Sequence, residues 1–334
     1  MSSAEIQHIA VAGGGAWGTA LALTALRAGR RVSLWAREPE IRAAIRTRGE
    51  NVQFLPGVSL SGIDVVDDIA AVAAADAVLM AAPAQHVRAT TLLFAPALSP
   101  GQPVILCAKG LERGTTKLMT EVLAEAAPQA AHAVLSGPSF ADDVARGLPT
   151  AVTLAAGDLA LAERLSAALG TAAFRPYASD DPTGAAIGGA VKNVLAIGCG
   201  IAEGKGLGLS ARAAVIARGF AEMRRFAAAL GAQPATLAGL SGLGDLVLTC
   251  SSAQSRNFAF GLALAKGETV PEATGHAHGV VEGAATARPV VERALALGVD
   301  MPIAEAVAAL VEGRVGVDEV IAGLLSRPLR AEAE

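Results

Sequence analysis

Two hydrophobic patterns divide the chain near residue 180. In the first part, short apolar runs with the length of buried strands alternate with segments of helical periodicity. Such alternation predicts a mostly parallel sheet with helices on both faces. We expect strands over residues 9–12, 31–35, 63–66, 77–82, 104–108, 132–135, 151–155 and 173–175, with a helix over 159–169 between the last two.

Beyond Asp181 the apolar positions follow helical spacing, and we find no convincing strand. Asp181 is suited to cap a helix that has Pro182 as its first residue. A further helix is indicated with Ser210 as its cap and Gly231 at its end. We therefore predict an α/β protein of two domains, a sheet domain over residues 1–180 and an all-helical domain over 181–334.

The first predicted strand runs into a glycine-rich turn followed by a helix over residues 19–28. Gly13, Gly15 and Gly18 have the spacing G-x-G-x-x-G. In this motif the first glycine makes a tight turn, the second lets the backbone approach a pyrophosphate, and the third lets the helix pack close to the strand. The pattern favours a Rossmann-type dinucleotide site over a structural glycine loop.

The end of the second predicted strand bears on which dinucleotide binds. In a dinucleotide fold this position faces the adenosine ribose, and NAD-selective sites place Asp or Glu there. The chain has Ala36 and Arg37 instead, so that no carboxylate repels a 2′-phosphate and a guanidinium is available to pair with it. We expect NADPH to bind at least as well as NADH. The alternative is that Arg37 is an ordinary surface charge.

Composition narrows the class of protein. Of the 334 residues 52% are hydrophobic, largely alanine, and only 3% are aromatic, which predicts close helix packing on small side chains. The net charge of −4 argues against a nucleic-acid surface, so a bound anion needs a local cluster of cations. Three cysteines without a C-x-x-C pair fit reduced core thiols and a cytoplasmic location: Cys107, Cys199 and Cys250.

Neither a membrane span nor a secretory signal is expected. The charge-free run over residues 89–108 is long enough to raise the question, but Pro96, Pro100 and Pro103 break any helix there. No basic region followed by an apolar core precedes the first strand.

Lys192 and Asp245 are the two charged residues in strongly apolar surroundings. Nearly every neighbour of Lys192 over residues 187–197 is apolar or small, and burial there would lower its pKa toward working pH. Alternatively, the lysine extends from a helix face to water. Asp245 is a candidate partner for Lys192, since buried charges need pairing, or else a helix N-cap.

Further candidates lie where parallel strands end. Ligands bind beyond the carboxyl ends of such strands, which places Pro83, residues 109–110 and residues 136–139 on the rim of the glycine turn. Lys109 is there a second cation for a substrate oxygen, or an ordinary strand-end lysine. Ser255, Arg256 and Asn257 at a helix start suit a phosphate, although an arginine is exposed by default.

A metal site is not predicted. His276 and His278 have an H-x-H spacing, but no third ligand clusters nearby, and glycines on both sides mark a loop.

Taken together, seven ordered motifs resemble one family, the bacterial-type NAD(P)-dependent sn-glycerol-3-phosphate dehydrogenases, from Gly13 to about Val320. The resemblance implies a 6-phosphogluconate dehydrogenase-like fold and a homodimer, while net charge and the proline positions lead us to expect no nucleic-acid partner and no membrane span. The motifs are residues 13–18, 108–112, 135–141, 190–194, 242–250, 255–257 and 280–283.

Carried over by position, the resemblance implies that Lys192 is the catalytic proton donor and acceptor, held by Asp245 and assisted by Lys109. The substrate contacts would be Lys109, Gly137, Ser139, Lys192, Asn193, Asp245, Ser255, Arg256 and Asn257. The cofactor contacts would be Gly13, Gly15, Ala16, Trp17, Gly18, Arg37, Lys109, Ala141, Arg256, Val280 and Glu282.

Two positions depart from the family. Ala16 stands where the family usually has serine, so backbone N–H groups alone are expected to contact the cofactor phosphate there. Gly14 stands where the family mostly has alanine, and we expect it to make the loop more flexible at a cost of about 0.5–1 kcal/mol.

The implied reaction is hydride transfer between NAD(P)H and dihydroxyacetone phosphate, which gives sn-glycerol 3-phosphate for glycerophospholipid synthesis. Arg256 would grip the phosphate and so position the reacting carbon. Two alternatives remain: a related β-hydroxyacid or hydroxyacyl-CoA dehydrogenase, and a non-catalytic NADPH-binding sensor.

Overall fold

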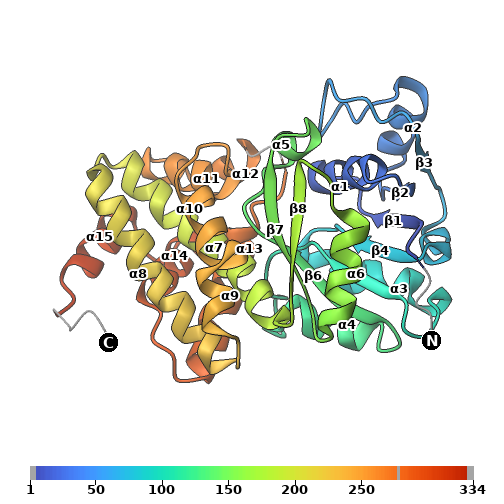
Figure 1. Cartoon of the computed structure of the whole chain (residues 1–334). Helices are drawn as coiled ribbons and strands as arrows, with labels where there is room; N and C mark the ends of the chain where they lie inside the picture. Colours follow the sequence, from blue (N-terminus) through green and yellow to red (C-terminus); the bar gives the residue numbers. More distant parts are fainter. Residues whose placement is uncertain (1–4, 277–278, 329–334) are drawn as a thin grey trace.

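The computed structural model describes residues 5–276 and 279–328, and its first half is built on one eight-stranded sheet (Figure 1). The strand order is β3-β2-β1-β4-β5-β6-β7-β8. Strands β1 to β6 are parallel, β7 is antiparallel to β6, and β8 is parallel to β7. The strands are β1 (His8–Ala12), β2 (Arg31–Trp35), β3 (Ile63–Val65), β4 (Ala77–Met80), β5 (Pro103–Leu106), β6 (Ala131–Ser136), β7 (Thr150–Ala156) and β8 (Phe174–Ser179).

Both faces of the central strands β1, β4 and β5 are buried, which explains why these strands are apolar throughout rather than alternating. Successive residues of β1 point to opposite faces: Ile9 and Val11 belong to one hydrophobic core, and Ala10 and Ala12 to another. The covering helices are α1 (Ala16–Arg27), α2 (Pro39–Arg48), α3 (Val87–Phe94), α4 (Met119–Ala126), α5 (Ala141–Ala145) and α6 (Leu159–Leu169). The mostly parallel sheet with two helical layers is therefore confirmed.

Several predicted boundaries moved. Helix α1 begins at Ala16 rather than at residue 19, because Gly15 already has extended backbone and serves as the N-cap. Strand β8 is longer than expected, since it pairs with β7 along its whole length. The predicted helix over 159–169 is confirmed as α6.

Among the described residues of the second half, every regular element is a helix. Its helices are α7 (Pro182–Gly204), α8 (Gly208–Ala229), α9 (Pro234–Ala238), α10 (Asp245–Cys250), α11 (Arg256–Ala265), α12 (Val270–His276), α13 (Glu282–Ala296), α14 (Pro302–Val311) and α15 (Val317–Leu325). Ser210 was wrongly predicted as the cap of α8. That helix starts at Gly208. Gly206 and Gly208 both have positive φ and reverse the chain direction after α7, so Ser210 already lies inside the first turn of α8.

Helix α7 is the central element of the helical domain. The Asp181 side chain accepts a hydrogen bond from Gly184 N at 2.8 Å, and Pro182 is the first helical residue, as predicted. The 23-residue helix is long and apolar enough to cross a membrane, yet 89% of its most apolar window is buried inside the protein. It packs on α8, α10, α11 and α13, and it also contacts β6 and β7. We therefore read it as the core helix of its domain.

Small residues allow these helices to approach closely, as the alanine-rich composition predicts. A Cβ at Gly200 of α7 would lie 2.1 Å from Phe258 O, and one at Gly261 of α11 would lie 2.1 Å from Ile197 O. Neither helix could keep this crossing with a larger side chain at those positions. The predicted core cysteines are confirmed as buried free thiols: Cys107, Cys199 and Cys250.

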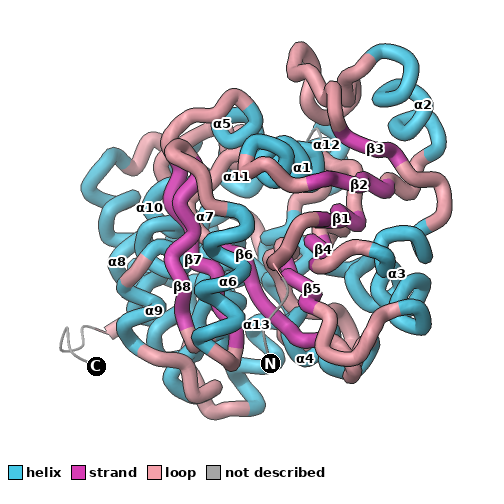
Figure 2. Tube along the Cα trace, turned by 45° about the vertical axis from the view of Figure 1, so that its right-hand side comes forward, coloured by secondary structure: helices cyan, strands magenta, loops and turns pink. Residues whose placement is uncertain are grey.

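The reversal at β7 decides where α7 starts. Because β7 and β8 run against the other strands, the carboxyl end of β8 lies at the edge of the sheet opposite the glycine turn. Figure 2 shows β7 and β8 at the side of the sheet next to the helical domain. Helix α7 begins after Ser179 at that opposite edge and runs back along the sheet, which brings its middle to the rim where β5 and β6 end.

Candidate active site

The glycine turn after β1 makes the close contacts that its spacing predicts. Gly13 has φ +137°, and a Cβ there would lie 2.6 Å from the Ala81 carbonyl carbon. A Cβ at Gly18 would lie 1.9 Å from Gly13 O, so α1 can pack on the turn only without a side chain at this position. By contrast, a Cβ at Gly15 would meet no protein atom within 4 Å. The second glycine therefore faces open space beside the N-terminus of α1.

Two supports of this turn were not identified from the sequence. The buried Asn51 side chain donates hydrogen bonds to Gly14 O at 2.8 Å and to Thr19 Oγ1 at 2.9 Å. Gly14 itself faces the end of β2, where a Cβ would lie only 2.3 Å from Ala36 Cβ. Glycine at position 14 is thus required by close packing against Ala36, which the expectation of a merely more flexible loop did not include.

Two of the predicted cofactor residues stand at the start of α1. Ala16 is its first residue, next to the open space at Gly15. The buried indole nitrogen of Trp17 has no hydrogen-bond partner among residues 5–276 and 279–328. A buried N–H donor without an acceptor is uncommon in proteins, and a bound ligand or water is one way to satisfy it.

A carboxylate stands next to Arg37, one residue beyond the strand-end positions that the sequence argument considered. Glu38 follows directly, and its Oε1 accepts from Arg37 Nε at 3.1 Å and from Arg37 Nη2 at 2.9 Å. The sequence argument considered only the two residues after the strand. Glu38, the next residue, is the N-cap of α2.

Lys192 is buried in the middle of α7 and does not extend to water. Its Nζ donates to Asp245 Oδ1 at 2.5 Å and to Thr249 Oγ1 at 2.8 Å, and its side chain is 8% exposed. Burial lowers the pKa of Lys192 to about 8, with Lys109 acting in the same direction and Asp245 opposing both. The ammonium has three N–H donors, two of which are used by these contacts.

The same carboxylate also binds a lysine from the other domain. Lys109 Nζ donates to Asp245 Oδ2 at 2.6 Å and to Gly137 O at 3.1 Å, while Ser139 Oγ donates to Gly137 O at 3.0 Å. Asp245 is completely buried, and two ammonium groups with one carboxylate (+2 − 1) leave a local charge of +1. A cation-rich centre therefore spans the two domains, in a protein whose net charge is −4.

Glycines and an irregular turn bring these groups together. A Cβ at Gly189 would lie 2.7 Å from Ser136 Oγ and 3.2 Å from Lys109 Cγ, so α7 can lie against the rim of the sheet only because this residue is glycine. Gly188 likewise allows close approach to Ser241 O. A π-helical turn, Leu240–Gly244, directly precedes Asp245, and such turns are frequent at functional sites.

A second polar group surrounds Asn193, the residue after Lys192. Asn257 Nδ2 donates to Asn193 Oδ1 at 2.9 Å, and Asn257 Oδ1 accepts from Gly283 N at 2.8 Å. Ser255 caps α11 by accepting from Phe258 N. The guanidinium of Arg256 hydrogen-bonds no described residue and lies against Gly279 and near Glu282. This arginine is therefore available for an anion.

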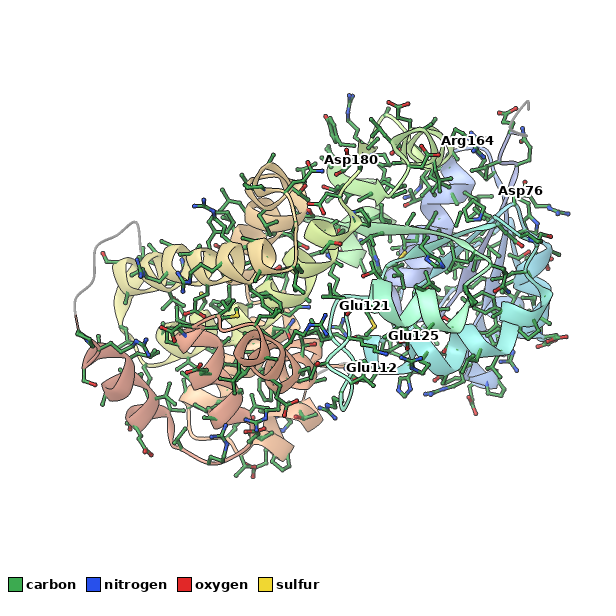
Figure 3. All side chains as sticks on the ribbon, turned by 90° about the horizontal axis from the view of Figure 1, so that it is seen from below. Asp76, Glu112, Glu121, Glu125, Arg164 and Asp180 are labelled. Carbon is green, nitrogen blue, oxygen red and sulfur yellow. The ribbon has the colours of Figure 1, made fainter. Side chains whose placement is uncertain are left out.

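Glu282 joins the domains at the start of α13. Its Oε1 accepts from Ala84 N, 198 residues earlier in the chain, at 3.0 Å, while its buried Oε2 has no partner among the described residues. Burial raises the pKa of Glu282, and the nearby Arg256 and Arg113 guanidinium groups oppose this shift. An ion pair between Arg293 and Glu121 also joins the two domains. Figure 3 labels Glu121.

The structure thus brings part of the predicted residues together in one place. Lys109, Gly137, Ser139, Lys192 and Asp245 form one hydrogen-bonded cluster. Arg37 is bound to Glu38 beside the glycine turn instead, Ala141 begins α5, and Val280 is 42% exposed.

Thr249 lies within the motif over residues 242–250, where no role was predicted for it. Because it lies one helical turn after Asp245, the two side chains share a face of α10, and this spacing is the signal that could have identified it.

No group of metal-ligating side chains occurs in the part of the chain that the structure describes. His276 Nδ1 instead pairs with Glu268 at 3.0 Å. His278 lies outside the described residues.

Comparisons with known proteins indicate the same family over nearly the whole chain. A family model described as NAD-dependent glycerol-3-phosphate dehydrogenase N-terminus matches residues 8–162, and one described as NAD-dependent glycerol-3-phosphate dehydrogenase C-terminus matches residues 181–322. Two similar proteins are named glycerol-3-phosphate dehydrogenase (NAD(P)+). The one from Parvibaculum lavamentivorans is 58% identical over 327 residues, 98% of each chain. The one from Caulobacter vibrioides is 58% identical over 328 residues, 98% of this chain and 99% of its own.

A crystal structure of glycerol-3-phosphate dehydrogenase from Coxiella burnetii is also similar. It is 36% identical, has a TM-score of 0.92, and the match covers 96% of this chain and 99% of that one.

Proposed function

The chain belongs to the NAD-dependent glycerol-3-phosphate dehydrogenase family, and we propose that it interconverts dihydroxyacetone phosphate and sn-glycerol 3-phosphate with NAD(P)H. The observation that carries this proposal is the Lys192–Asp245–Lys109 cluster. It places a buried ammonium of lowered pKa from the helical domain at the rim of the dinucleotide-binding sheet.

The residues present fit a dinucleotide. The open space at Gly15, the N-terminus of α1 and the unpartnered Trp17 N–H suit a pyrophosphate and its neighbours. Glu282 offers a second buried atom without a partner. We assign cofactor contacts to these residues together with Gly13, Ala16, Gly18, Arg37, Lys109, Ala141, Arg256 and Val280.

When bound, the reduced nicotinamide supplies the hydride, and the protein supplies the proton. Lys192 is mostly protonated at neutral pH because its pKa is about 8, and it has one N–H donor left for the carbonyl oxygen. Donation of this proton assists reduction, and the resulting amine accepts a proton from the hydroxyl group in the reverse direction.

The other residues of the site hold charge and position. Asp245 and Thr249 fix the Lys192 ammonium, and Lys109 adds a second positive charge near the developing oxyanion. We assign the phosphate to Ser255, Arg256 and Asn257, with Asn193 positioned by Asn257. A planar guanidinium that binds no described residue suits bidentate pairing with a phosphate.

A substrate panel tests the proposal. NADPH and NADH oxidation should be followed by absorbance with dihydroxyacetone phosphate, unphosphorylated dihydroxyacetone and several oxo acids. We expect rapid turnover with the first alone, since only it engages the phosphate contacts. A preference for an oxo acid would favour a related hydroxyacid dehydrogenase, and binding of NADPH without turnover would favour a sensor.

The proton donor is tested in the same assay. Lys192→Met should lower kcat about 100-fold or more. Lys205→Met is the matched control, because it removes a lysine at the end of the same helix that pairs with Asp318 instead. Near-normal turnover of the Lys192 variant would remove this lysine from the mechanism.

Further properties belong to the same proposal. We propose domains over residues 1–180 and 181–334, supported by the change from sheet to helix between Ser179 and Pro182. We also propose a homodimer, a cytoplasmic location, supported by three free cysteines, and a role in supplying glycerol 3-phosphate for glycerophospholipid synthesis.

A further inference from the structure

The segment from Trp35 to Glu38 lies directly beside the glycine turn. Gly13 N donates to Trp35 O at 2.9 Å, and the contact between Gly14 and Ala36 leaves no room for a Cβ. In a dinucleotide fold this place is where the adenosine ribose lies. The side chains that follow Ala36 are therefore the ones that face the ribose 2′ position.

The backbone of this segment is held from behind by Arg42. Its Nη1 donates to Ala36 O and, at 3.1 Å, to Arg37 O, while its Nε donates to Asp67 Oδ1 at 3.0 Å. Arg46 is bound to Asp67 as well. These two guanidinium groups are already committed to backbone carbonyls and a carboxylate, so they position the segment.

Arg37 and Glu38 differ from them, because each has the other as its only hydrogen-bond partner among the described side chains. Their side chains are 67% and 41% exposed. An exposed ion pair of this kind contributes little to stability, typically about 0–1 kcal/mol. A ligand can therefore separate the two side chains at small cost.

We infer that Glu38 is a specificity-determining residue that, with Arg37, lets the protein use both NADH and NADPH. This inference rests on the proposed function. With NADH, Glu38 accepts a hydrogen bond from the ribose 2′-hydroxyl, and Arg37 neutralises its carboxylate. With NADPH, Arg37 leaves Glu38 for the 2′-phosphate, and the Glu38 carboxylate then repels the phosphate. Glu38 thus favours NADH, and Arg37 favours NADPH.

Measurements of cofactor binding at equilibrium test the role of Glu38 without any need for catalysis. Kd values for NADPH and NADH should be measured by nicotinamide fluorescence in the absence of substrate, for the wild type, Glu38→Gln and Arg37→Gln. In Glu38→Gln we expect the ratio of the NADH Kd to the NADPH Kd to rise about 5- to 10-fold. In Arg37→Gln it should fall by about the same factor or more.

Glu40→Gln is the matched control, because Glu40 is an exposed carboxylate in the first turn of the same helix and loses the same charge. Its ratio should change less than about twofold. Adenosine 2′,5′-bisphosphate, which has the 2′-phosphate but no nicotinamide, should compete more strongly in Glu38→Gln than in the wild type.

The outcomes separate the two proposals. If the wild type binds both cofactors and reduces dihydroxyacetone phosphate, but the Kd ratio of Glu38→Gln is unchanged or moves no more than that of Glu40→Gln, only the role of Glu38 is overturned. If the wild type binds neither cofactor, the proposed function fails and the inference fails with it.

Discussion

Replacing Asp245 by Asn is the sharpest test of how the site works. Asp245 is a fully buried carboxylate that faces two ammonium groups, Lys192 at 2.5 Å and Lys109 at 2.6 Å. The amide keeps the shape but removes the negative charge, so two positive charges are left facing each other. Removal of one partner from a buried ion pair costs about 3–5 kcal/mol, and we expect the free energy of unfolding to fall by that amount.

Asp318→Asn is the matched control for stability. Asp318 pairs with Lys205 at the same distance, 2.6 Å, but its side chain is 84% exposed. We expect a loss of less than about 1 kcal/mol in urea unfolding, because solvent screens the charge. Equal losses in the two variants would show that burial of Asp245 does not determine its contribution.

The pH dependence of the Asp245 variant tests the chemistry. Among the causes acting on Lys192, Asp245 raises its pKa, whereas burial and Lys109 lower it. Without the carboxylate the pKa must fall below about 8, so that Lys192 loses its proton at lower pH. For dihydroxyacetone phosphate reduction by the wild type, we expect kcat to decline above about pH 8, and in the Asp245 variant this decline should move about 1–3 pH units lower.

The assay is kcat at saturating NADPH across about pH 6 to about pH 10. Adding Lys109→Met to Asp245→Asn removes the second positive charge, and the decline should return part of the way to higher pH. A folded Asp245→Asn protein with the pH profile of the wild type would refute the role of Lys192 as the proton donor.

Three further predictions concern other parts of the molecule. Gly14→Ala should lower stability by about 1–3 kcal/mol, and Ala36→Gly in the same chain should restore part of it, because the closest contact is between the two Cβ positions. An unfolding series in urea would detect this, and full stability of the single variant would contradict it. Burial raises the pKa of Glu222, which accepts from Ile303 N and Ala304 N, to about 7. The folded protein therefore binds this proton more tightly, so stability should fall as pH rises from about 4.5 to about 7, and Glu222→Gln should abolish that part of the slope. Arg256→Ala should raise the KM for dihydroxyacetone phosphate more than it lowers kcat, and an unchanged KM would count against a phosphate contact.

The fold was largely predictable because its signals are local. The apolar runs gave every strand, the glycine spacing gave the turn after β1, and Asp181 with Pro182 gave the start of α7. One helix start was predicted wrongly because it depends on backbone conformation and not on a capping side chain. Helix α8 starts from a turn with positive φ at Gly206 and Gly208, so that the capping residue Ser210 was misleading.

The sequence predicted which residues belong to the site better than it predicted which of them contact one another. The apolar neighbours of Lys192 and Asp245 correctly indicated two buried charges in need of pairing. That Lys109 shares the same carboxylate depends on residues 136 positions apart, and no local pattern encodes it. Glu38 was missed because of a local uncertainty. A shift of one residue at the end of a strand decides which side chain is expected to face the ribose, and sequence patterns do not fix strand ends that closely.

One property of α7 explains both its composition and its chemistry. The helix is apolar enough to resemble a membrane span, and small residues such as Gly188, Gly189 and Gly200 let neighbouring backbone and side chains cover it closely. That covering excludes water from Lys192, and burial is the largest cause of its lowered pKa. A looser helix with larger residues would admit water and leave the lysine near its ordinary pKa, at which it would hold its proton too firmly to exchange it near neutral pH. The close helix packing and the proton transfer that we propose for Lys192 are therefore two consequences of the same sequence pattern.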